Sequence, residues 1–333
     1  MKKALPILLV CAMLLCISAF ALAEGVLNIA SPNSDGLLSI IPVFEEKTGI
    51  KVTVESLGTG DCMKRISTEA ENPTFDVMYG GSLANYVRNA DLFETYVSKE
   101  DANLMEAYRN TLGFCTSYTV DGSVLLVNTD LAKELGVEIT GYADLLNPAL
   151  KGKIAAADPS ASSSSFCQLT NMLLAMGGYE SEDAWKYVTD LYVNIDGKIT
   201  SGSSAVYKGV YNGEYVVGLT YEDPCVTFLK DGATNIEIVY PVEGTVFLPA
   251  QLGIVKGAKN MDNAKAFADF MLSEEAQVFL GTNTTSRPIR DVVAPNEYMT
   301  PMNDINLIFE DSEYVTSHTD ELKEKVQDII MDI

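Results

Sequence analysis

Short apolar segments alternate with polar loops along the first part of the chain. Runs of strand length occupy residues 26–31, 50–56 and 75–79. Each run is followed by a loop rich in Gly, Ser, Asn or Thr, and then by apolar positions at helical spacing. Three repeats of strand, loop and helix predict a parallel sheet with helices on both faces. In such sheets ligands bind at the carboxyl ends of the strands, which is where these loops lie.

The same pattern starts again in the middle of the chain. A continuous apolar strand is expected at 123–130, and later strands are expected at 151–158, 214–224, 235–241 and 245–258. Helices are expected over 262–280 and 319–333. Because one α/β pattern is entered twice, we predict two lobes joined by two chain crossings, near 123–130 and 245–255.

The chain of 333 residues is too long for one ordinary core, which agrees with two domains. We expect lobe one to hold residues 24–122 together with the C-terminal part. The first crossover is expected at 123–130 and lobe two at 131–245. Residues 246–333 would form the second crossover, the return to lobe one and the C-terminal helices.

The N-terminus has the features of a secretory signal peptide. Lys2 and Lys3 precede an apolar run over 4–20, and Ala21-Leu22-Ala23 is a typical cleavage site. Residues 1–23 are therefore predicted to be removed, and the protein is expected to be periplasmic or extracellular. A membrane anchor is the alternative, but the apolar run is short for a span.

The net charge excludes several classes of partner. The whole chain carries −23, and removal of the two signal-segment lysines leaves −25. This balance argues against nucleic acid and against anionic membrane surfaces. It does not argue against a small anionic ligand, because a local binding site can oppose the global field.

Four cysteines remain in the mature chain, and two interpretations stay open for them. Export permits two disulfides among Cys62, Cys115, Cys167 and Cys225, in any of three pairings, and buried free thiols are the alternative. The spacing contains no CxxC pair, which argues against zinc.

Two serine-rich segments lie where helices are expected to begin. The segment "DPSASSSSF" follows the strand at 151–158, and "SGSS" at 201–204 precedes a second helix. A helix N-terminus leaves backbone N–H groups unpaired, so small hydroxyl residues there suit an anion. We predict an anion cradle from Ser160, Ser162, Ser163, Ser164, Ser201, Gly202, Ser203 and Ser204. The alternative is a helix cap with surplus serines, or a plain linker.

Acidic residues end the apolar strand at 214–224. Tyr221, Glu222 and Asp223 could accept hydrogen bonds from hydroxyl or amine groups, and the alternative is a surface turn before Pro224. No nucleophile motif is present, and His318 is the only histidine, so a histidine triad is excluded. We predict a binding protein without a cofactor, not an enzyme.

Several segments carry a resemblance to a known family. They are "VFEEKTGIKV", "FDVMYGGS", "ADPSASSSSF", "SGSSAVYKGVYNGEYVVGLTYEDP", "GIVKGAKNMDNAKAFADFMLSEEAQ" and "SRPIRDVV". With the signal peptide, they resemble extracellular solute-binding proteins of ABC importers, in the branch that binds ferric ion, sugar phosphates and phosphonates. The resemblance implies a periplasmic-binding-protein-like flytrap fold. Each lobe would be a mixed, mainly parallel sheet flanked by helices, with two crossover strands as the hinge.

The resemblance also implies a partner and a ligand site. The partner would be a membrane permease, and a monomer is expected. The ligand would be a phosphorylated or phosphonate-bearing organic anion seated on the serine segments, with its hydroxyl or amine groups at Glu222 and Asp223. Lobe one would close over it with Asn33, Ser34, Gly58, Thr59, Gly60, Gly81 and Ser82.

Three alternatives to this function remain. A ferric-ion binder would use Tyr207, Tyr221 and Glu222, although the adjacent tyrosine pair typical of that branch is missing here. A secreted enzyme on the same fold lacks a nucleophile and a base. A sensor domain that feeds a receptor instead of a permease has the same sequence features.

Overall fold

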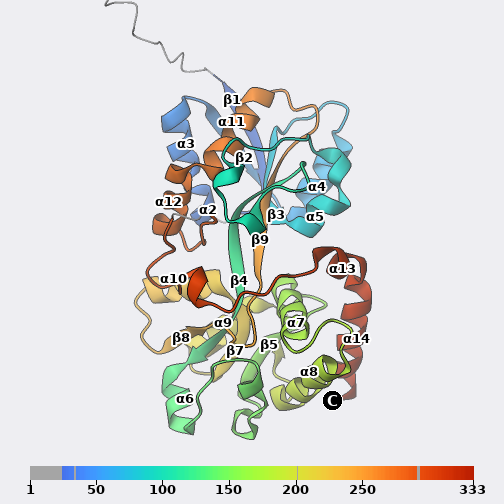
Figure 1. The fold of residues 1–333 in the computed structure, drawn as a ribbon, viewed down its shortest axis with the longest axis vertical. Coiled ribbons are helices and arrows are strands. Elements are labelled where there is room, and N and C mark those ends of the chain that lie inside the picture. Colours follow the sequence, from blue (N-terminus) through green and yellow to red (C-terminus); the bar gives the residue numbers. More distant parts are fainter. Residues whose placement is uncertain (1–24, 34, 201, 291–292) are drawn as a thin grey trace, which may run out of the picture.

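The computed structural model describes residues 25–33, 35–200, 202–290 and 293–333. The signal segment predicted at 1–23, and Ser34 and Ser201 of the predicted site, lie outside the described residues. Figure 1 shows two lobes, one above the other, joined by two long strands. Among the described residues, no helix has the length and apolar character that crossing a bilayer requires.

Lobe one contains a parallel group of strands with helices on both faces. β1 pairs with β2 and with β3 in parallel. Phe44, Phe267 and Met271 lie in the core on one face, and Met63 and Tyr86 lie in the core on the other. Its elements are β1 (Val26–Ser31), α2 (Asp35–Leu38), α3 (Ile41–Thr48), β2 (Lys51–Ser56), α4 (Thr59–Thr68), β3 (Val77–Ser82), α5 (Leu83–Arg88), α11 (Met261–Leu272) and α12 (Glu274–Asn283), with short 3-10 turns at Ala90–Leu92, Asp101–Asn103 and Glu106–Tyr108.

Lobe two repeats this arrangement. β5 pairs in parallel with β6 and β7. Leu169 and Trp185 lie in the larger core, and Val206 and Val210 pack on the opposite face. Its elements are α6 (Thr129–Leu135), 3-10 turns at Ala143–Leu146 and Pro148–Leu150, β5 (Ile154–Ala157), α7 (Ser163–Ala175), α8 (Glu182–Ile195), β6 (Ile199–Thr200), α9 (Ser203–Tyr211), β7 (Val217–Tyr221), α10 (Glu222–Lys230) and β8 (Ile236–Val239).

Two antiparallel strands connect the lobes. β4 (Thr116–Asn128) pairs with β9 (Phe247–Ile254) through its first half, up to Gly122. From Ser123 onward β4 pairs with β7 and β8 of lobe two. β9 also pairs with β3 of lobe one. The middle of β4 is therefore the point at which one sheet becomes the other, which makes it the structural hinge.

The C-terminal helices differ from the sequence expectation, because they lie in lobe two. Val315 of α13 (Ser312–Ser317) and Leu322 and Val326 of α14 (Thr319–Asp332) belong to the larger core of lobe two. The segment between α12 and α13, which includes a 3-10 turn at Met302–Asp304, thus adds a third crossing (Figure 1). The helix expected over 262–280 is also two helices, since Ser273 ends α11 and its side chain caps α12.

The structure resolves the cysteine alternatives and confirms the predicted fold class. Cys62, Cys115, Cys167 and Cys225 are all free, and Cys167 alone among them is not fully buried. The architecture is the two-lobed α/β fold expected from the sequence.

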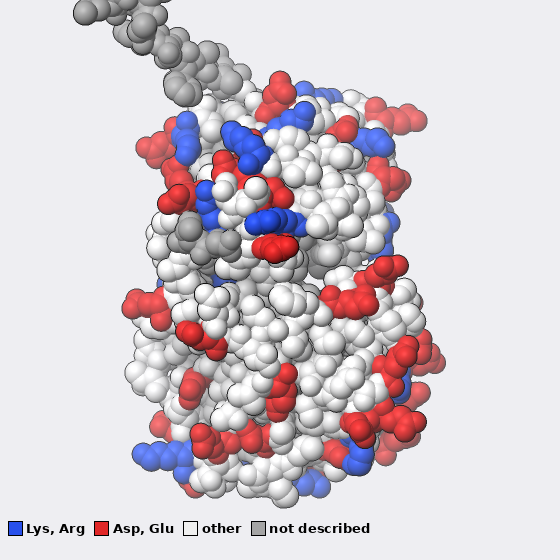
Figure 2. All heavy atoms as spheres, viewed as in Figure 1, with Lys and Arg blue, Asp and Glu red and all other residues white. Residues whose placement is uncertain are grey.

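Figure 2 shows acidic side chains spread over both lobes on this face, without a dominant basic patch. On this face the negative charge is therefore not confined to one lobe.

Candidate functional site

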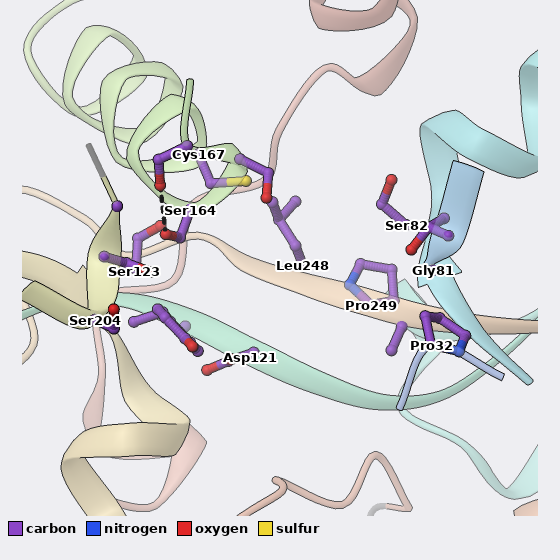
Figure 3. A pocket seen from close by; sticks show the side chains of 18 of the residues that line it. Pro32, Gly81, Ser82, Asp121, Ser123, Ser164, Cys167, Ser204, Leu248 and Pro249 are labelled. Atoms are coloured by element: carbon purple, nitrogen blue, oxygen red, sulfur yellow. Dashed lines mark hydrogen bonds between the residues drawn. The ribbon is translucent and has the colours of Figure 1, made fainter. Parts of the chain in front are cut away.

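A cavity of about 760 Å³ lies between the lobes, beside the hinge strands. A cavity of this size is in the usual range for small-molecule sites. Both lobes and the hinge contribute to it, and Figure 3 shows the labelled side chains gathered around one space. Its lining is Pro32, Asn33, Thr59, Gly81, Ser82, Asp121, Gly122, Ser123, Ala161, Ser162, Ser163, Ser164, Cys167, Gly202, Ser203, Ser204, Tyr207, Tyr221, Leu248, Pro249 and Ala250.

The first serine segment forms the N-terminus of α7 on this cavity. Ser162 is the N-cap, and its Oγ accepts a hydrogen bond from the backbone N–H of Ser165 at 3.4 Å. The hydroxyls of Ser162 and Ser164 are 3.2 Å apart (Figure 3). No described residue accepts a hydrogen bond from the backbone N–H of Ser163 or Ser164. These amides and hydroxyls form a donor-rich surface with the partial positive charge of a helix start.

Two buried amide side chains hold α7 in place. Gln168 donates to the carbonyls of Val124 (2.8 Å) and Thr220, so it ties the helix to β4 and β7. Asn171 donates to the carbonyl of Gly244 at 2.9 Å and accepts from the backbone N–H of Val246 at 2.6 Å. The serine segment therefore sits on a helix that is bonded to β4 and to the chain just before β9.

The second serine segment forms the N-terminus of α9. Gly202 is the N-cap in an extended conformation, and Ser203 and Ser204 begin the helix and line the cavity. The two helix starts thus face one space, as the sequence pattern predicted. Ser160 is not part of the lining. Its Oγ donates to Asp158 and accepts a hydrogen bond from the side chain of Gln327 at 2.7 Å, so it anchors α14 to the loop before α7.

Glu222 and Asp223 do not line the cavity, which corrects the sequence-based placement. They lie in the first turn of α10, which begins directly after β7 and turns both side chains away. Glu222 is 1% exposed and forms a bidentate pair with Arg287, at 3.0 Å from Nε to Oε2. Asp223 accepts a hydrogen bond from the hydroxyl of Thr285.

The carboxyl group that does line the cavity belongs to Asp121, which the sequence analysis missed. It lies on β4 at the hinge, and its Oδ1 accepts hydrogen bonds from the backbone N–H groups of Glu222 (3.1 Å) and Asp223 (3.3 Å). Burial and the nearby acids raise the pKa of Asp121 well above its usual range, while the two backbone hydrogen bonds act in the opposite direction. The strand expected from the sequence began at 123, so Asp121 was placed before it, whereas β4 begins at Thr116 and includes this residue.

Lobe one contributes loop residues to the opposite wall. Asn33, Thr59, Gly81 and Ser82 line the cavity, whereas Gly58 and Gly60 do not. The side chain of Asn33 donates to the hydroxyl of Tyr118 on β4 at 3.0 Å, so the hinge strand orients it. Ser82 caps α5 together with Asn85.

Gly80 is the residue that lets the Asn33 loop approach β3. Its φ is +122°, and a Cβ there would lie 2.6 Å from Oδ1 of Asn33. We expect Gly80→Ala to lower the free energy of unfolding by about 1–3 kcal/mol, through backbone strain and displacement of the loop. Gly213→Ala is the matched control, because Gly213 also has a positive φ of +79° but has no atom within 4 Å of the added Cβ. Equal losses in denaturant unfolding of the two variants would show that the contact with Asn33 is unimportant.

Two tyrosines also line the cavity. Tyr207 comes from α9 and Tyr221 from the end of β7, and their ring centroids are 6.3 Å apart. Burial raises the pKa of both phenols. Tyr207 and Tyr221, two of the three ligands expected for iron, therefore line the cavity. The third, Glu222, does not, because it is paired with Arg287. Within the described ranges, no group of three or more His, Cys, Asp or Glu side chains is placed to hold a metal.

The cavity wall contains few charged side chains. Asp121 is the one charged side chain among the described lining residues, which include no Lys or Arg. An anion in this cavity would therefore meet backbone N–H groups and hydroxyls instead of basic side chains.

Comparisons with known proteins identify a family and several relatives of this chain. Residues 40–303 match the family profile described as "Bacterial extracellular solute-binding protein". A relative from Synechocystis, "Iron uptake protein A1", is 29% identical over 261 residues, which is 74% of this chain and 70% of that protein. A "Putative 2-aminoethylphosphonate-binding periplasmic protein" of Salmonella typhimurium is 25% identical over 266 residues, covering 76% of this chain and 74% of that protein.

A solved structure shows the same fold over nearly the whole chain. The periplasmic binding protein AfuA from Actinobacillus pleuropneumoniae, with fructose-6-phosphate bound, is 26% identical. Its TM-score is 0.74, and the match covers 93% of this chain and 99% of that chain.

Proposed function

Since the chain belongs to the bacterial extracellular solute-binding protein family, whose members are solute-binding components of ABC importers, we propose that it captures a small organic anion with a phosphate or phosphonate group. The observation that carries this proposal is the meeting of two serine-bearing helix N-termini, α7 and α9, in one cavity. Each helix start favours negative charge. AfuA, which resembles this chain, was solved with a sugar phosphate bound, and the Salmonella relative is named for a phosphonate.

The proposed mechanism is capture by closure of the lobes. The anionic group binds the hydroxyl of Ser162 and the N–H groups and hydroxyls of Ser163, Ser164, Ser203 and Ser204. Lobe one, through Asn33, Thr59, Gly81 and Ser82, then closes about the middle of β4 and the start of β9. A membrane permease then binds the closed, ligand-bound form. We propose that the protein acts as an exported monomer and performs no chemical step.

A ligand screen tests this proposal. We expect hexose phosphates or alkylphosphonates to raise the melting temperature, because a ligand that binds only the folded state adds about 2.7 kcal/mol at 100 times its dissociation constant. Isothermal titration calorimetry would then measure the affinity. The corresponding unphosphorylated hexose is the control. No response to any phosphate or phosphonate, with a response to the neutral sugar, would contradict the proposal.

Ferric ion is the second candidate, and one observation favours it. Tyr207 and Tyr221 line the cavity together with Asp121, so three oxygen donors are present even though Glu222 is not. The Synechocystis relative is named as an iron uptake protein. Iron bound by tyrosinates absorbs visible light, so a coloured complex on addition of stoichiometric ferric citrate would favour this candidate. Loss of that colour in Tyr221→Phe would assign it to the cavity.

A further inference from the structure

Asp121 occupies a special place in the cavity that the proposed anion site does not explain. Its backbone pairs with Leu248 of β9, and two residues later Ser123 pairs with Tyr221 of β7. The residue therefore lies where β4 passes from one lobe to the other. Figure 3 shows Asp121 on this strand, between the serine residues of lobe two and the prolines Pro32 and Pro249.

One oxygen of this carboxyl group accepts hydrogen bonds from the protein, and the other has no donor among the described residues. Oδ1 accepts the backbone N–H groups of Glu222 and Asp223, which caps α10. No described residue donates a hydrogen bond to Oδ2. The neighbouring acids differ from Asp121, because each has a side-chain partner: Glu222 pairs with Arg287, and Asp223 accepts a hydrogen bond from Thr285. Capping of α10 therefore accounts for only one half of the Asp121 side chain.

A carboxylate in an anion-binding cavity repels the anion unless the ligand brings a compensating group. The described wall has no Lys or Arg that could neutralise Asp121. The wall thus combines two helix starts that favour negative charge with one acid that favours positive charge. Burial raises the pKa of Asp121, which is a penalty on the charged form that contact with a cation would offset.

We infer that the ligand is a zwitterion, in which an ammonium group meets Oδ2 of Asp121 while a phosphonate or phosphate group meets the starts of α7 and α9. This inference rests on the proposed function, because it assumes that the ligand occupies this cavity. It assigns to Asp121 the discrimination between aminoalkyl phosphonates or phosphates and their analogues that lack the ammonium group. A hydroxyl-bearing sugar phosphate gains less from this residue, because its hydroxyl carries no charge to offset the carboxylate.

Two ligands of nearly equal size test the assignment. Titration calorimetry at neutral pH would compare 2-aminoethylphosphonate with ethylphosphonate on the wild-type protein, on Asp121→Asn and on Asp223→Asn. The amide that replaces the Asp121 carboxyl group retains an oxygen that can cap α10, and thermal melting checks that the variant is folded. Asp223→Asn is the matched control, because it removes a nearby acid that does not line the cavity.

We expect the wild type to bind the amino compound at least about 10-fold more tightly than ethylphosphonate, as for a charge-assisted contact. Asp121→Asn should lose that preference and bind ethylphosphonate at least as well as the wild type does. Asp223→Asn should keep the preference. Equal wild-type affinities, or a preference that survives in Asp121→Asn, would overturn the inference alone. Failure of the wild type to bind either phosphonate, or any phosphate in the wider screen, would overturn the proposed function and this inference with it.

Discussion

Ser162→Asp is expected to weaken binding of a phosphate or phosphonate ligand by about 100-fold, or about 2.8 kcal/mol. Ser162 caps α7 and lines the cavity. Aspartate is as good an N-cap as serine, so the helix should remain intact. The added carboxylate would instead occupy the place of the ligand's anionic group. Two like charges about 4 Å apart near a protein surface repel by about 4 kcal/mol before screening, which is enough for this loss.

Ser181→Asp is the matched control for this prediction. Ser181 is the N-cap of α8 in the same lobe, and its side chain accepts from the backbone N–H of Ala184, as Ser162 accepts from Ser165. It does not line the cavity. The two variants make the same chemical change at equivalent helix positions. Titration calorimetry should show a loss in Ser162→Asp alone, and equal affinities in the two variants would remove α7 from the proposed site.

Arg287→Ala is expected to destabilise the protein by about 3–5 kcal/mol, because it leaves the buried charge of Glu222 without a partner. Both side chains are 1% exposed, and Tyr240 also donates to Glu222. Arg287 further donates to the carbonyl of Thr300 at 2.8 Å, and its own carbonyl accepts from the hydroxyl of Thr119 on β4. The ion pair therefore fastens the third crossing to α10, whereas the bond to Thr119 is made by the backbone of Arg287 and should survive the substitution.

Denaturant unfolding of three variants measures this effect. Lys186→Ala removes one partner of an exposed ion pair with Asp190 and should cost no more than about 0.5 kcal/mol. The double variant Arg287→Met with Glu222→Leu removes both buried charges and should cost less than Arg287→Ala alone. A loss in Arg287→Ala no larger than that in Lys186→Ala would mean that the buried pair does not stabilise the fold.

The serine segments could be predicted as parts of the site because their signal is local. Each lies between a strand and an amphipathic helix, and that order places a helix start at the carboxyl edge of a sheet. Ser162, Ser163, Ser164, Ser203 and Ser204 all reach the cavity in the structure. Ser160, two residues earlier, does not, because its hydroxyl bonds to Gln327 of a C-terminal helix that no local pattern connects with it.

The acidic part of the site could not be predicted in the same way. Tyr221, Glu222 and Asp223 were expected to face the ligand together, but the chain changes from strand to helix between the first and the second. That change turns Glu222 toward Arg287, which is 65 residues away in the sequence. It also brings the backbone of Glu222 to Asp121, 101 residues away. Neither partner is visible from periodicity.

Hydrophobic periodicity and loop composition were sufficient to predict the α/β class, the two lobes, the second joining strand and the helix starts that carry the serines. These signals act over a few residues, so they can be read without knowledge of distant contacts. The first joining strand was expected at 123–130, but β4 begins at Thr116 and already pairs with lobe two from Ser123 onward. Three other features required the folded chain: which carboxyl group lines the cavity, which arginine neutralises Glu222, and the packing of the last two helices on lobe two. Those outcomes depend on strand register and on contacts between distant segments, and the cost of burying an unpaired charge selects among them.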